Sequence, residues 1–84
     1  MEDKCLTTDI VDLVFEENIK QLNKWGIQNR SPFEWLTYLA EEVGELAEAI
    51  QNSEYHNGEK RNVVNEAIQA ATLALKIAEM HREF

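Results

Sequence analysis

The amino-acid sequence predicts an all-α fold, a small antiparallel bundle of three main helices that oligomerisation completes. Apolar residues recur at intervals of three and four, and no segment shows the period of two that a half-buried strand requires. Turn-forming residues interrupt the pattern at about residues 26–31 and 52–58, which leaves three helical segments. The last segment is apolar over most of its circumference, which is typical of a helix buried on more than one side. With only two other helices in the chain, that burial indicates an oligomer.

The first predicted helix runs from about Thr8 to Trp25, where Gly26 supplies a left-handed stop. Its apolar stripe consists of Val11, Phe15, Leu22 and Trp25. Because such a stripe normally faces inward, we expect Trp25 to lie in the core.

The second predicted helix has the clearest start signal in the chain. Ser31 can cap it, Pro32 suits the first helical position, and Glu34 completes a Ser-x-x-Glu capping box. We expect this helix to extend to about Gln51. Its apolar stripe, which we expect to face the core, comprises Leu36, Leu39, Ala40, Val43, Leu46, Ala47 and Ile50.

A second stripe of different character borders the first on the same helix. Its members are Trp35, Tyr38, Glu42, Glu45 and Ala49. An ideal helix places Glu42 about 100° from Val43, at the border of the core. Glu41 and Glu48 lie on the solvated side, so the acids of this helix are not equivalent.

The third predicted helix begins at about Glu59 and continues to the C-terminus. Its core stripe comprises Val63, Val64, Ala67, Ala71, Ala74 and Ala78. More apolar side chains lie beyond that stripe: Ile68, Leu73, Leu75 and Ile77. One edge of the helix carries Glu66, Gln69, Leu73 and Lys76 at spacings of three, four and three.

Helices joined by a short loop pack antiparallel, which places Glu45 level with Glu66 and Glu42 opposite Gln69. Three carboxylates at a core border repel one another unless a cation neutralises them. Oxygen ligands without His or Cys select hard cations, so Mg²⁺ is the natural occupant and Mn²⁺ is an alternative. Such an ion keeps positions open for water and phosphate oxygens, as phosphoryl transfer requires.

Composition narrows the class of partner. The 84 residues form one domain with 16 acids against 8 bases, a formal charge of −8. That charge disfavours a nucleic-acid partner, and an acidic chain that handles phosphates needs a divalent cation. No apolar run approaches the ~18 residues of a membrane span, and the N-terminus has no signal-peptide core, so we expect a cytoplasmic protein with no membrane partner. Cys5 is alone, which excludes a disulfide framework.

The acidic motifs resemble those of a known family. Glu41-Glu42-Val43-Gly44-Glu45, followed by Glu66-Ala67-Ile68-Gln69, is similar to the EExxE…ExxD signature of the MazG-like all-α nucleotide pyrophosphohydrolases. The segment WLTYLAEEVGELAEAI also resembles the second helix of that family, and the resemblance covers about residues 31–80. It implies a single MazG-like helical domain over residues 1–84 that assembles as a homodimer or homotetramer. The implied reaction hydrolyses a (deoxy)nucleoside triphosphate to the monophosphate and pyrophosphate.

The resemblance also implies the roles of the acids. Glu42, Glu45 and Glu66 would bind Mg²⁺, and Glu41 would be an outer ligand or would orient or deprotonate the attacking water. Gln69 departs from the family pattern, because it stands where the motif has Asp. It keeps an oxygen ligand and loses a charge, and its other interpretation is a hydrogen bond between helices.

Other residues keep two interpretations each. Trp35 and Tyr38 either stack on a nucleotide base or pack in an oligomer interface. Lys76 either meets a phosphate or extends to solvent from a buried helix. For the whole chain, the alternative to an enzyme is a non-catalytic MazG-like helical oligomer that binds a nucleotide, a metal or a protein partner.

Overall fold

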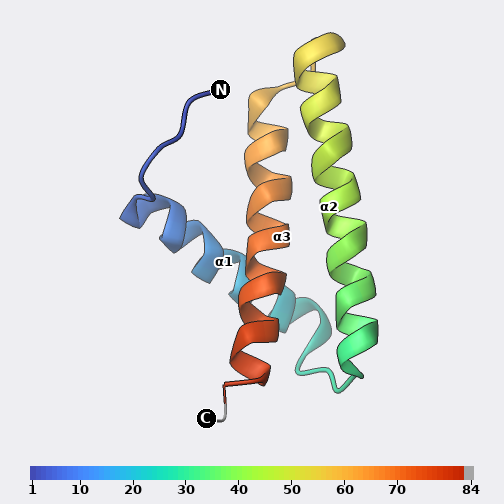
Figure 1. The fold of residues 1–84 in the computed structure, drawn as a ribbon. Helices are drawn as coiled ribbons and strands as arrows, with labels where there is room; N and C mark the ends of the chain where they lie inside the picture. Colours follow the sequence, from blue (N-terminus) through green and yellow to red (C-terminus); the bar gives the residue numbers. More distant parts are fainter. Residues whose placement is uncertain (83–84) are drawn as a thin grey trace.

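A computed structural model of the chain describes residues 1–82 and shows an all-helical fold without strands over that range (Figure 1). The helices are α1 (Thr8–Trp25), α2 (Pro32–Tyr55) and α3 (Lys60–Met80). The predicted all-α fold class with three helices is therefore confirmed, and the oligomer stays a prediction. None of these helices has the length and apolarity that crossing a membrane demands.

Local signals explain where each helix begins and ends. Thr7 precedes α1, and its hydroxyl accepts a hydrogen bond from the Ile10 amide at 3.3 Å. Gly26 ends α1 with a φ of 68°, and its amide donates to the Leu22 carbonyl at 2.8 Å. At the start of α2 the capping box is complete, because Ser31 and Glu34 each accept from the other's amide at 3.2 Å.

The loop between α2 and α3 is shorter than expected. The second helix continues past Gln51 to Tyr55, and the chain then reverses through Asn57, whose φ is 59°. The Gly58 amide donates to the Asn52 carbonyl at 2.8 Å, and a Cβ at Gly58 would lie 2.9 Å from that of Asn52. This close approach requires glycine. The third helix ends at Met80, and the last two residues of the expected helix lie outside the described range.

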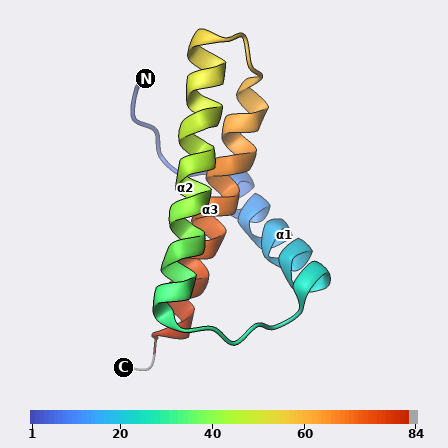
Figure 2. The same cartoon turned by 90° about the vertical axis from the view of Figure 1, so that its right-hand side faces the viewer.

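The antiparallel pair α2–α3 forms the long part of the molecule, and α1 crosses α3 obliquely (Figures 1 and 2). Within residues 1–82, α3 packs against both other helices, whereas α1 and α2 do not pack on each other. The most buried side chains accordingly lie mainly on α3. They are Ala49, Ile68, Ala70, Thr72 and Leu73. Packing on two sides within one chain explains why α3 is apolar over so much of its circumference, without any second subunit.

The prediction that the aliphatic stripe of α2 faces the core was wrong for most of its residues, although Leu39 and Leu46 are half-buried. Leu36, Val43 and Ile50 of the expected core stripe are 56%, 51% and 41% exposed, and Ala40 and Ala47 are also exposed. Ala49, from the neighbouring stripe, is buried instead. The helix turns its mixed aromatic and acidic stripe toward α3, and most of its aliphatic stripe lies at the surface.

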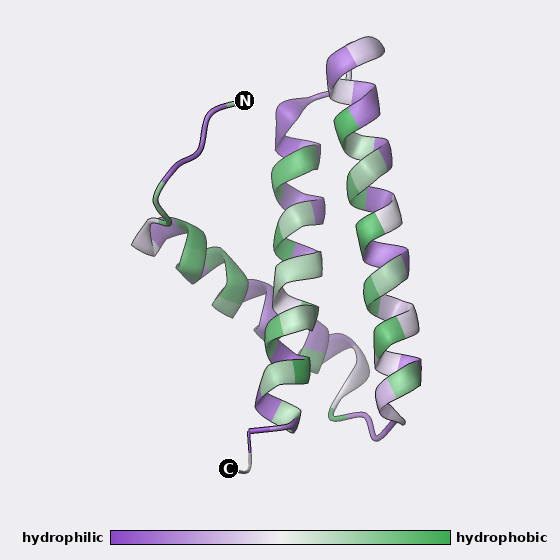
Figure 3. Cartoon of the chain, viewed as in Figure 1, coloured by the Kyte–Doolittle hydropathy of each residue, from purple (hydrophilic) through white to green (hydrophobic). Residues whose placement is uncertain are grey.

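The first helix shows the same inversion more strongly. Its half-buried residues against the rest of the chain are Val14, Glu17, Asn18 and Gln21. The apolar side chains lie outward, with Phe15 62%, Ile19 57% and Trp25 56% exposed, so the expected core position of Trp25 was wrong. Hydropathy colouring shows apolar residues along all three helices (Figure 3).

Candidate functional site

Three carboxylates meet where α2 and α3 lie side by side. One oxygen each from Glu42, Glu45 and Glu66 lies within 4.8 Å of the other two. Glu42 and Glu45 share a face of α2 because they are three residues apart, and the antiparallel α3 brings Glu66 to the same level. The structure therefore places together the three acids that the sequence predicts to be ligands.

The surroundings of these acids disfavour their charges. Burial is the main cause that raises the pKa of Glu42, and the carboxylates of Glu45 and Glu66 raise it further. Burial also raises the pKa of Glu66, together with the neighbouring Glu45 carboxylate. One oxygen of Glu42 and one of Glu66 are buried without a hydrogen-bond partner among the described residues. Unpartnered buried oxygens in a group of three acids are the donor set that a hard divalent cation fits.

Gln69 lies on the side of α3 that faces α1. Its side chain helps to line an open cavity of about 190 Å³ between these two helices. The other lining residues are Leu13, Glu16, Glu17, Lys20, Asn65 and Ile68. Gln69 thus borders a polar cavity, within one helical turn of Glu66.

The first helix adds polar groups that sequence reasoning missed. Glu17 lies close enough to Glu42 for its charge to contribute to the raised pKa of that residue. Gln21 donates to Glu17 Oε2 at 2.9 Å and accepts from Lys76 Nζ at 2.7 Å. The signal in the sequence was a stripe at i, i+3, i+4 and i+7 formed by Val14, Glu17, Asn18 and Gln21, which the adjacent apolar stripe outweighed.

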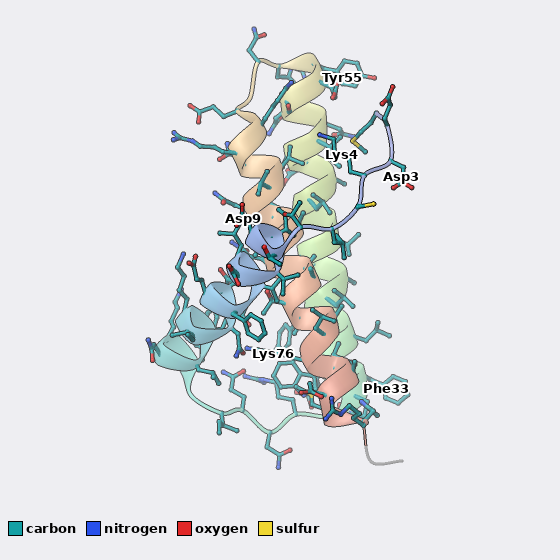
Figure 4. The ribbon with its side chains drawn as sticks, turned by 90° about the vertical axis from the view of Figure 1, so that its left-hand side faces the viewer. Asp3, Lys4, Asp9, Phe33, Tyr55 and Lys76 are labelled. Carbon is teal, nitrogen blue, oxygen red and sulfur yellow. The ribbon has the colours of Figure 1, made fainter. Side chains whose placement is uncertain are left out.

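Lys76 therefore reaches toward α1, and Figure 4 shows it between α1 and α3. The expected aromatic pair lies at the beginning of α2. The rings of Trp35 and Tyr38 meet edge to face, with centroids 6.2 Å apart and an interplanar angle of 74°. The guanidinium of Arg30, in the α1–α2 loop, lies 5.1 Å from the Tyr38 ring centroid. Both rings are half-buried, and a cation already covers one of them.

The remaining acids differ from the cluster. Glu41 is exposed and lies outside the group of three, and Glu48 is exposed as well. Cys5 is a free, exposed thiol. Glu41 is thus positioned beside the cluster in sequence and open to solvent, where water is plentiful.

Comparison with known proteins gives no neighbour, since no family model, curated protein or solved structure matches the chain. The residues and their geometry are therefore the basis on which a function is inferred.

Proposed function

We propose that this chain is a Mg²⁺-dependent nucleotide pyrophosphohydrolase that converts a (deoxy)nucleoside triphosphate into the monophosphate and pyrophosphate. The observation that supports it is the meeting of Glu42, Glu45 and Glu66 within 4.8 Å, with two buried carboxylate oxygens left unpartnered. The resemblance of both acidic motifs to the MazG-like signature gives this cluster its chemical interpretation.

In this proposal Glu42, Glu45 and Glu66 hold the cation, for which Mn²⁺ can substitute. A cation held there would supply positive charge that screens the polyphosphate and would favour deprotonation of the attacking water. Glu41, exposed next to Glu42, orients or deprotonates that water. Gln69 contributes a neutral oxygen from the α1 side of α3, and Trp35 and Tyr38 offer ring edges and faces to the base.

The proposed assembly is a homodimer or homotetramer. Its support is the inverted facing of two helices, since α1 and α2 both leave apolar stripes in solvent while their more polar stripes face α3. Exposed apolar surface of this extent marks an association surface.

Gln69 supports a second candidate, a non-catalytic helical oligomer that binds a metal, a nucleotide or a protein partner. A cluster with three carboxylates and one amide has less negative potential for Mg²⁺ than one with four carboxylates. The two candidates share the metal site and differ in whether turnover follows.

The test is pyrophosphate release from a panel of ribo- and deoxynucleoside triphosphates, with Mg²⁺, with Mn²⁺ and with a chelator. We expect metal-dependent release in equal amounts with the nucleoside monophosphate, which also ranks the bases. Binding of metal and nucleotide by calorimetry without release would replace the enzyme with the binding oligomer. The matched control is Glu48→Gln, which removes an exposed acid of the same helix and should leave turnover unchanged.

A further inference from the structure

The inward face of α1 is polar, which a helix serving only the core would not need. Glu17, Asn18 and Gln21 are half-buried on this face, while Phe15 and Ile19 are mostly exposed. An amphipathic helix normally buries its apolar stripe. In this chain α1 instead presents hydrogen-bonding groups to α3.

Those groups form a relay with a defined direction. Lys76 Nζ donates to Gln21 Oε1 at 2.7 Å, and Gln21 Nε2 donates to Glu17 Oε2 at 2.9 Å. The Gln21 amide is therefore used at both ends, which fixes its orientation. The relay joins α1 and α3 across 55 residues of sequence, so it also fixes where the ammonium lies.

The Lys76 ammonium keeps most of its binding capacity. It has three donors, and its hydrogen-bond partner within residues 1–82 is a neutral amide. No carboxylate of that range lies within ion-pair distance of it. Burial lowers the pKa of Lys76, and the Glu17 carboxylate opposes this by favouring the charged form. The result is a partly buried positive charge in a chain of net charge −8.

The Glu17 end of the relay lies near the carboxylate cluster, because its charge contributes to the raised pKa of Glu42. Glu17 borders the same cavity as Gln69, one turn from Glu66. We propose that Gln21 and Glu17 are positioning residues that hold the Lys76 ammonium for an oxyanion of the substrate's polyphosphate chain. This inference rests on the proposed function, in which the cation at Glu42 and Glu66 binds the same chain of phosphates. Two positive centres suit a linear polyanion, and a fixed ammonium binds it with less loss of side-chain entropy than a free one.

The experiment is calorimetric titration of Mg²⁺ alone, and then of inorganic tripolyphosphate in the presence of Mg²⁺. Gln21→Met keeps the length of the side chain and removes both hydrogen bonds. We expect it to weaken tripolyphosphate binding about tenfold and to leave Mg²⁺ affinity unchanged. Glu17→Gln keeps an acceptor for the Gln21 amide and removes a charge that repels phosphate, so its tripolyphosphate affinity should equal or exceed that of the wild type. Gln51→Met, at an exposed position of α2, is the control.

The outcomes separate this inference from the proposed function. If the wild type binds Mg²⁺ and tripolyphosphate and Gln21→Met binds both as well, the relay is only structural and the inference is overturned. If Gln21→Met also loses Mg²⁺ binding or helical circular dichroism, the substitution has disturbed the fold. The inference then stands only if Glu17→Met weakens tripolyphosphate binding and keeps Mg²⁺ binding intact. A wild type that binds no Mg²⁺ overturns both proposals. In a turnover assay with a nucleoside triphosphate that the wild type hydrolyses, Gln21→Met should raise KM more than it lowers kcat.

Discussion

At the scale of single residues, burial separates acids that the sequence places side by side. Glu41, Glu42 and Glu45 lie within five positions, yet only Glu42 is half-buried with an unpartnered oxygen. Its angle of about 100° from Val43 predicted that it borders the core, although Val43 itself is exposed. The spacing also predicted that Glu66 lies at the level of Glu45. Glu17 was not predictable in this way, because no sequence spacing relates α1 to the α2–α3 pair.

The raised pKa values of Glu42 and Glu66 predict how stability depends on pH without metal. Between 4.5 and the raised folded values, the folded chain binds more protons at these groups than the unfolded chain. The contribution of these two groups to the free energy of unfolding therefore decreases as pH rises through that window. Between pH 4 and pH 8, the melting temperature should fall less in Glu42→Gln than in the wild type. At pH 7 the melting temperature of Glu42→Gln should exceed that of the wild type by roughly 4 °C, which corresponds to about 1 kcal/mol.

Mg²⁺ should make the wild type more stable than Glu42→Gln, which reverses the order expected without metal. The ion requires deprotonated ligands, so it should stabilise the wild type more at pH 7 than at pH 5. Glu42→Gln and Glu66→Gln should gain little from Mg²⁺ and should lose turnover while keeping helical circular dichroism. Equal Mg²⁺ stabilisation of the wild type and both variants would contradict a metal site at these residues.

Gln69→Asp tests whether the amide occupies a ligand position. A fourth carboxylate beside Glu66 should raise Mg²⁺ affinity about tenfold, because it adds charge where the ion binds. The measurement is calorimetry in parallel with Asn65→Asp, which adds the same charge at another residue that lines the cavity next to α1. An equal gain in both variants would show a general charge effect and remove Gln69 from the proposed ligand set.

At the scale of the elements, local chemistry determined the bounds that the sequence predicted well. The C-terminal end of α1 follows from Gly26 and its positive φ, and the start of α2 follows from the capping box of Ser31 and Glu34. The facing of the helices was predicted poorly. Leu36 and Phe15 belong to stripes that would be buried in a self-sufficient chain, and spacing alone does not say whether the same chain or another copy covers them.

The capping box of α2 should contribute measurably to stability. Ser31→Ala removes the hydroxyl that accepts from the Glu34 amide, and it should lower the free energy of unfolding by about 1 kcal/mol. Urea unfolding measures this loss. Ser53→Ala, a serine inside the same helix, should change stability less because it caps no helix end. A loss in Ser31→Ala no larger than that control would mean that the box contributes little.

At the scale of the whole molecule, the described core is small and lies mainly on α3. The aliphatic stripe of α2 and the outer face of α1 remain in solvent, although they contain some of the largest apolar side chains of the chain. A core this small supplies only modest hydrophobic stabilisation to a single chain. In the proposed oligomer, a second copy would cover both faces and would leave the carboxylate cluster, on the other stripe of α2, within one chain.

Disrupting either apolar face should therefore break an oligomer. We expect analytical ultracentrifugation of the wild type to give a molecular mass of two or four times 9.7 kDa. Leu36→Lys and Ile19→Lys each place a charge at an exposed apolar position of a different helix, so both should shift the mass toward 9.7 kDa and lower the melting temperature at low protein concentration. Glu48→Lys makes a larger change of charge on the solvated side of α2 and should leave the mass unchanged. A monomeric wild type, or an oligomer that survives both lysines, would mean that these faces bind something other than a second copy.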